Sequence, residues 1–191
     1  MSTCDLARLI VARGGGRQCG DGCRRRRAER GSSAGKTSIG RCLQALLPRP
    51  WLLLGVDDLI HVAPPSSVSY GPQGEVVLGG GWRALESAWS RGVAEMARAG
   101  AGVIIDDVFL DGAASQQRTG VHLAGLEVLW VGVQCAPEVA AARERARGDR
   151  PTGMAAGQAT AVHRGVVYDL VVDSGTASPD ECAGLIAERM V

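Results

Sequence analysis

The sequence has 191 residues, of which 46% are hydrophobic and 21% are charged, with 21 Lys and Arg against 20 Asp and Glu. This length suits one domain with a sizeable core, and the balanced charge gives no sign of nucleic acid as a partner. No apolar run approaches the roughly 18 residues that cross a bilayer, and the N-terminus lacks the order of a signal peptide. We therefore expect a cytoplasmic protein with no membrane partner, whose six scattered cysteines stay reduced.

The first 30 residues form an atypical N-terminal segment. Residues 13–30 consist mainly of Gly, Arg and Cys and show neither the period of a helix nor that of a strand. By itself this stretch is expected to be disordered, and we place a boundary after it, so that residues 31–191 form the functional domain. The nearest strand candidate is residues 6–11, which two glycines follow shortly afterwards.

Residues 31–37 predict a phosphate-binding loop. They are Gly31, Ser32, Ser33, Ala34, Gly35, Lys36 and Thr37. A glycine-rich turn that opens a helix aims backbone N–H groups at one point, where the helix dipole also favours an anion. Lys36 can reach the β and γ phosphates of ATP, and the Thr37 hydroxyl can bind Mg²⁺. Arg30 stands where the complete pattern has glycine, so the match is one residue short.

Apolar runs and amphipathic stretches alternate from this loop to the end of the chain. The runs are rich in Val, Ile and Leu, as is typical of buried parallel strands. The alternation predicts an α/β fold, with a parallel sheet that helices cover on both faces. The predicted strands are 51–56, 102–105, 126–133 and 166–172, and the predicted helices are 36–47, 82–99, 137–148 and 179–190.

Acidic residues follow two of the predicted strands. Ligands bind at the carboxyl ends of strands in such sheets, so these carboxylates are expected to face the phosphate loop. We predict Asp57 as the general base that accepts the proton of an attacking hydroxyl, with Asp58 pointing away. Of the pair that ends the later strand, we assign Asp106 to the metal and Asp107 to the substrate, although the sequence does not decide between them. The alternative for each is a helix or strand cap.

Arginines are concentrated in the predicted helix 137–148. Arg143 and Arg147 are four residues apart and so share one helix face, whereas Arg145 faces elsewhere. We predict that the pair clamps ATP phosphates as part of a lid, because phosphoryl transfer spreads negative charge over the γ-phosphoryl oxygens. A solvated surface is the alternative.

From residue 31 onward the chain resembles the chloramphenicol phosphotransferases. The strings that carry the resemblance are GSSAGKT at 31–37, LQALLPRPWLLLGVDDLI at 43–60, RALESAW at 83–89, IIDDVFL at 104–110, VLWVGVQC at 128–135, ARGDR at 146–150 and HRGVVYDLVVD at 163–173. The resemblance implies a P-loop kinase fold like that of nucleoside monophosphate kinases, with a five-stranded parallel sheet. It also implies ATP-dependent transfer to the primary hydroxyl of chloramphenicol. In this family Lys36 and Thr37 would hold nucleotide and Mg²⁺, Asp57 would be the base and Arg147 the lid cation.

The chain departs from this family at its N-terminus. An apolar strand should lead directly into the phosphate loop, but residues 24–30 are charged and cannot form a central strand. Either a long insertion separates strand and loop, or the stretch is translated from a shifted reading frame, which its Arg, Gly and Cys content favours. Two other functions therefore stay open: a kinase of another hydroxylated metabolite, and a non-catalytic nucleotide-binding relative. Homo-oligomer formation is also left open.

Overall fold

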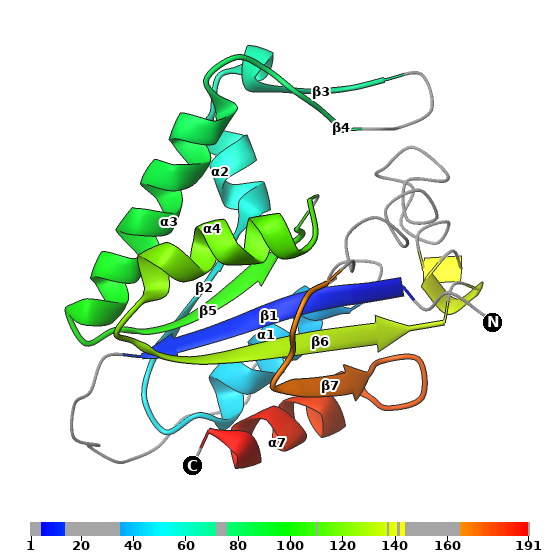
Figure 1. Cartoon of the computed structure of the whole chain (residues 1–191). Helices are drawn as coiled ribbons and strands as arrows, with labels where there is room; N and C mark the ends of the chain where they lie inside the picture. The colour runs from blue at the N-terminus through cyan, green and yellow to red at the C-terminus, as the bar shows by residue number, and fades with distance from the viewer. Residues whose placement is uncertain are drawn as a thin grey trace.

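A five-stranded sheet forms the centre of the molecule (Figure 1). The computed structural model describes residues 5–13, 35–71, 76–109, 111–136, 138–140, 142–143 and 165–190. The strands, in their spatial order, are β2 (Trp51–Gly55), β5 (Gly102–Asp107), β1 (Asp5–Arg13), β6 (Glu127–Cys135) and β7 (Leu170–Asp173). All four strands predicted after the phosphate loop are present, with their ends shifted by a few residues.

The direction of β1 makes the sheet mixed. β2 pairs in parallel with β5, and β6 pairs in parallel with β7, but β1 lies between β5 and β6 and is antiparallel to both. The prediction of an entirely parallel sheet is therefore wrong for the central strand. An apolar pattern does not encode direction, because an antiparallel ladder satisfies the backbone groups of both neighbours as well as a parallel one.

Residues 5–13 thus belong to the sheet, and of the stretch 13–30 that was expected to be disordered only Arg13 is described, at the end of this strand. The strand covers the predicted candidate 6–11. Its nine residues span about 30 Å, and the 21 residues between Arg13 and Gly35 can extend over about 70 Å, which is enough to return along the strand. Residues 14–34 lie outside the described part of the chain, so the hypotheses of an insertion and of a shifted frame both stay open.

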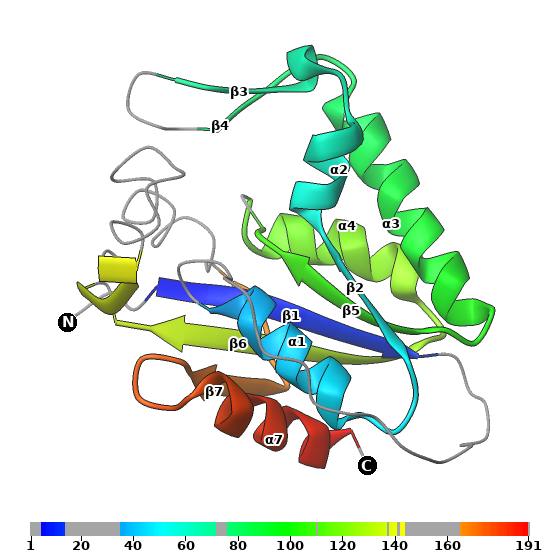
Figure 2. The same cartoon turned by 180° about the vertical axis from the view of Figure 1, so that it is seen from behind.

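Two layers of helices cover the sheet. On one face lie α1 (Lys36–Leu46) and α7 (Pro179–Arg189), and on the other lie α3 (Trp82–Arg98) and α4 (Ala113–Leu123). Successive strand residues alternate between the layers, as the pleat requires: Ile104 packs on the α1 face, whereas Val103 and Ile105 pack on the α3 face. Figure 1 views the sheet from the α4 side and Figure 2 from the α1 side.

Four elements were not predicted from the sequence. They are α2 (Val56–Val62), the 3-10 turn η1 (Pro65–Ser67), the hairpin of β3 (Val68–Tyr70) and β4 (Val76–Leu78), and α4. The hairpin stands away from the main sheet and is joined to it through α2 and α3 (Figure 1). Of the predicted helix 137–148, residues 138–140 and 142–143 are helical, and the remaining residues lie outside the description.

Within the described residues, no helix is both long enough and apolar enough to span a membrane.

Candidate active site at the carboxyl edge of the sheet

The carboxyl ends of β2, β5, β6 and β7 share one edge of the sheet, because these four strands run in one direction. Helix α1 begins at the same edge, and its N-cap is Gly35, which has a φ of 78°. This left-handed conformation is one that glycine adopts without the steric cost of a Cβ atom. The first N–H groups of α1 have no partner within the helix, so the edge presents donors and the positive end of a helix dipole.

Three of the predicted site residues meet at this edge. The Thr37 hydroxyl donates a hydrogen bond of 2.6 Å to Asp106 Oδ2, and Lys36 Nζ lies 3.6 Å from Asp106 Oδ1. The Lys36 side chain is only 7% exposed and that of Asp106 only 15%. A lysine is rarely buried unless its charge is compensated, so the ion pair with Asp106 accounts for its position.

The cation at the start of α1 is a lysine in a sequence whose other cationic residues are arginines. Lys36 is the one lysine of the sequence, so the other 20 of its 21 cationic residues are arginines. A lysine is a compact charge with rotatable donors on a flexible stem, whereas the planar guanidinium of arginine favours bidentate contacts. A lysine at the start of α1 therefore suits the predicted phosphate loop. Residues 31–34 of that loop lie outside the described residues.

Strand alternation separates the two acids at the end of β5. Asp106 follows Ile104 onto the α1 face, where it meets Thr37, whereas Asp107 follows Ile105 onto the α3 face. The sequence alone did not decide between the two, and the pleat places Asp106 at the lysine and threonine.

Asp107 lies in a different environment. Burial raises the pKa of this carboxyl to about 6, and the negative charges of Glu86 and Asp106 also raise it. The 2.6 Å hydrogen bond that the carboxylate accepts from the Val108 N–H lowers the pKa and offsets part of this rise. Asp107 is therefore a weakly acidic group on the α3 side of the site edge.

Asp57 lies in the first turn of α2 and is exposed. Gly55, the residue before α2, pairs with Asp106 across the β2–β5 ladder, which brings the start of α2 to the site edge. The capping contact comes from Asp58, whose Oδ2 accepts a 2.7 Å hydrogen bond from the Gly55 N–H. The cap of α2 is thus made by Asp58 and not by Asp57, which was the alternative role considered for Asp57. The role of Asp57 as a base stays a prediction.

Arg143 lies beyond the end of β6 and reaches Gly35 of the predicted phosphate loop. Its Nη2 donates a 2.8 Å hydrogen bond to the Ser174 carbonyl, and its Nη1 lies 3.4 Å from Ser174 Oγ. A Cβ atom added to Gly35 would lie 3.6 Å from Arg143 Nη1, so the guanidinium is in contact range of the loop. Arg147, the second predicted clamp residue, lies outside the described residues.

Ser174 is a site residue that the sequence analysis missed. It directly follows β7, is 3% exposed, and donates a 3.1 Å hydrogen bond to the Gln134 carbonyl. By this contact and those with Arg143, it links the ends of β6 and β7 to the arginine that is predicted to clamp phosphates. Its place at the end of a parallel strand was the available signal, because that is where ligands bind in α/β sheets.

The described residues hold no group of three or more His, Cys, Asp and Glu side chains that could cage a metal ion. Mg²⁺ is commonly held by one or two protein oxygens together with substrate phosphates and water, and the Thr37 and Asp106 oxygens fit that mode.

The fold and this edge define the class of protein. A glycine turn that opens a helix at the carboxyl edge of an α/β sheet, with a lysine and a threonine on a strand-end aspartate, is typical of P-loop proteins.

Comparison with known proteins gives the family. Residues 29–191 match the family described as chloramphenicol phosphotransferase-like protein, and the chain belongs to it. Two similar proteins of Mycobacterium tuberculosis, from strains CDC 1551 and H37Rv, are named "Putative O-phosphotransferase MT2714" and "Putative O-phosphotransferase Rv2636". Each is 30% identical over 175 residues, covering 78% of this chain and 73% of the relative. Family and relatives together support phosphotransfer to a hydroxyl group.

Proposed function

We propose that the protein transfers the γ-phosphoryl group of ATP to a hydroxyl of a small molecule, with the primary hydroxyl of chloramphenicol as the first candidate acceptor. The observation that carries this proposal is the cluster of Lys36, Thr37 and Asp106 at the start of α1. The choice of chloramphenicol rests on the family to which the chain belongs. An enzyme of this kind would confer resistance to the antibiotic.

In the proposed site, the start of α1 binds the phosphates of ATP and Lys36 neutralises the β and γ groups. Thr37 and Asp106 would hold Mg²⁺, which would offset the negative charge that develops on the phosphates. Arg143 is positioned against the loop by Ser174 and can contact the phosphates from the side of β6. Arg147 is proposed to complete the clamp.

Two carboxylates serve the acceptor in this proposal. Asp57 accepts the proton as the acceptor oxygen bonds to the γ-phosphorus, and the bond from that phosphorus to the bridging oxygen breaks to release ADP. Asp107 contacts another group of the acceptor from the α3 side, where burial keeps the pKa of its carboxyl raised and permits it to donate or accept a hydrogen bond. Both assignments derive from positions at the site edge.

The test is turnover of the purified full-length chain with MgATP and chloramphenicol, with the phosphorylated product detected by mass spectrometry. We expect a product heavier by one phosphoryl group, and its loss in Asp106→Asn. A panel of other hydroxylated metabolites separates the chloramphenicol enzyme from a kinase with a different acceptor. The proposal is refuted if no acceptor is phosphorylated under conditions in which ATP binds.

The reversed β1 favours a second candidate, a nucleotide-binding relative without turnover. In a P-loop unit the strand before the loop leads directly into it, whereas β1 ends at the opposite edge, where Arg13 pairs with Glu127. ATP binding without transfer to any acceptor would select this candidate.

A further inference from the structure

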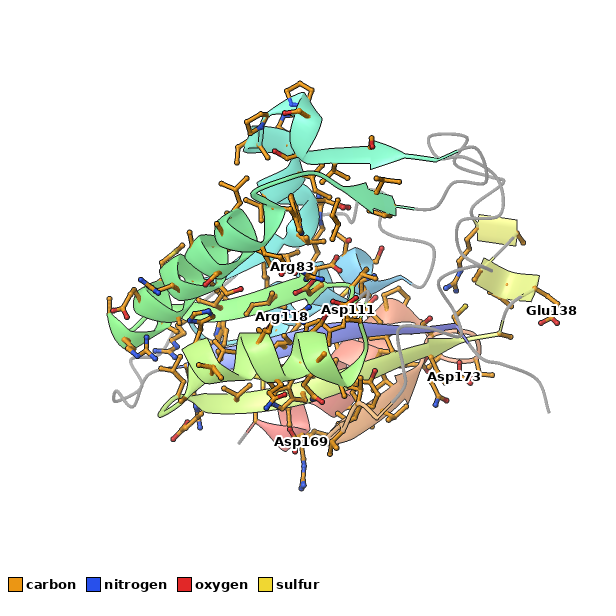
Figure 3. All side chains as sticks on the ribbon, turned by 45° about the horizontal axis from the view of Figure 1, so that its top comes forward. Arg83, Asp111, Arg118, Glu138, Asp169 and Asp173 are labelled. Carbon is orange, nitrogen blue, oxygen red and sulfur yellow. The ribbon has the colours of Figure 1, made fainter. Side chains whose placement is uncertain are left out.

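Four alternating charges meet on the α3 and α4 side of β5, and we name them the charge cluster. Its members are Arg83 and Glu86 on α3, Asp111 before α4, and Arg118 on α4. Asp111 Oδ2 accepts hydrogen bonds from both arginines, with Arg118 Nη2 at 2.8 Å. Glu86 Oε2 lies 2.8 Å from Arg83 Nη1 and 3.9 Å from Arg118 Nε. Figure 3 shows Arg83, Asp111 and Arg118 gathered between the two helices.

The charge cluster fixes the turn that follows the acids of β5. Asp111 is four residues beyond Asp107, and between them Phe109 is buried in the core. The Asp111 N–H donates to Ser115 Oγ at 3.3 Å, and Arg118 Nη2 donates to the same oxygen at 2.8 Å. The turn is therefore tied to α4 by backbone and side chain, and to α3 by Arg83.

The charge cluster is expected to add little to the stability of the fold. The four side chains are between 32% and 50% exposed, and ion pairs at such positions contribute about 0–1 kcal/mol each. Arg118 Nε is buried and makes no hydrogen bond within the described residues, which carries an unfavourable desolvation cost. What the cluster does provide is a fixed orientation, because one carboxylate shared by two guanidinium groups allows few geometries.

The charge of Glu86 also acts on Asp107, since it contributes to the raised pKa of that carboxyl. Arg83 donates to Glu86 at 2.8 Å, so the cluster sets where this negative charge lies. The restraint on Asp107 comes through the chain, because Asp111, four residues further on, is held by both arginines of the cluster.

We propose that Glu86, Asp111 and Arg118 are positioning residues that hold Asp107 in one orientation toward the acceptor. The inference rests on the proposed function, in which Asp107 contacts the acceptor and the nucleotide lies on the α1 side of the sheet. Loss of the cluster should therefore change the handling of the acceptor and leave that of ATP unchanged.

The test compares Arg118→Gln with a matched variant, Arg98→Gln. Arg98 also ties α3 to α4, at the opposite end of the helices. It pairs with Glu95 at 2.7 Å and donates to the His122 and Ala124 carbonyls at 2.7 and 3.2 Å. Both variants remove one arginine that bridges the two helices, and they differ in distance from the site edge.

We expect Arg118→Gln to lower kcat/KM for the acceptor by roughly 10- to 100-fold, since a displacement of about 1 Å can cost that much. The KM for ATP should stay unchanged, and Arg118→Lys should recover part of the loss. Arg98→Gln should lower the unfolding temperature and leave both KM values as in the parent. The inference is overturned if Arg118→Gln leaves acceptor kinetics unchanged, or if both arginine variants change them equally.

Failure of the proposed function would look different. A parent chain that phosphorylates no acceptor contradicts that function, and calorimetric titration with chloramphenicol then tests the cluster by binding alone. Weaker binding in Arg118→Gln than in Arg98→Gln would support the positioning role. A parent chain that neither transfers nor binds overturns both proposals.

Discussion

Replacement of Lys36 by methionine removes the positive charge and retains a side chain of similar length. The Lys36 ammonium lies 3.6 Å from Asp106 in a setting where both side chains are largely buried. Removal of one partner of a buried ion pair lowers the free energy of unfolding by about 3–5 kcal/mol when nothing else compensates the remaining charge. Asp106 keeps its 2.6 Å hydrogen bond from Thr37, so we expect a smaller loss of unfolding free energy, about 1–3 kcal/mol.

The same variant should lose its response to nucleotide. A ligand present at about 100 times its Kd stabilises the folded state by about 2.7 kcal/mol. Denaturant unfolding with and without MgATP should show this gain in the parent and little of it in Lys36→Met, together with a large loss of turnover. The phosphate site would be refuted by a variant that keeps both the stabilisation by MgATP and near-parental turnover.

An independent measurement uses the parent chain itself. Because Lys36 is the one lysine of the sequence, an amine-selective reagent has one side-chain target. MgATP should slow the labelling of Lys36 as measured by peptide mass spectrometry. Equal labelling rates with and without MgATP would contradict the assignment of Lys36 to the nucleotide.

Three further predictions concern other parts of the structure. Asp57→Asn should lower phosphoryl transfer by roughly 10²–10⁴ with unchanged ATP affinity, because asparagine cannot accept the proton; an unimpaired kcat would exclude Asp57 as the base. Burial raises the pKa of Asp107 to about 6, above the unfolded value of 3.8. The contribution of the protonated carboxyl to the free energy of unfolding is therefore complete below about pH 4 and is lost as the pH rises through 6. Asp107→Asn should therefore gain about 2 kcal/mol of stability relative to the parent between pH 4 and pH 7, and parallel pH profiles would contradict this. Gly102→Ala should cost about 1–3 kcal/mol in denaturant unfolding, since its Cβ would lie 2.3 Å from the Trp51 ring, and an unchanged midpoint would show that the ring moves aside freely.

The parts of the fold that sequence predicted are those with a strong hydrophobic period. Strand β5 and helix α3 were found because their apolar residues recur at the spacing of a buried strand and of an amphipathic helix. Helix α4 was missed because residues 113–123 carry few apolar side chains, and one of its buried residues is Ser115. The β3–β4 hairpin was missed because strands of three residues carry no usable pattern.

Apart from Ser174, the residues that meet at the site edge had been singled out from the sequence, while their roles stay predictions. The sequence order of glycine, lysine and threonine before a helix identified the lysine and threonine, and strand ends identified the acids. Partners across the fold were not predictable, because the contacts of Asp106 with Thr37 and of Arg143 with Ser174 join residues far apart in sequence. The charge cluster was missed for the same reason, since Arg83 and Asp111 are 28 residues apart and neither ends a strand.

The reversed central strand has a consequence for the order in which the protein assembles. β1 precedes the other described strands in the chain, and the residues of β5 and β6 that pair with it lie about 90 to 130 positions later. Among the described strands, β1 alone joins the parallel pair of β2 and β5 to the parallel pair of β6 and β7. β1 can pair only after β5 and β6 have been made, and until then apolar residues such as Ile10 and Val11 lack the partners that bury them. Pairing of β1 with both strands then joins the two halves into one sheet.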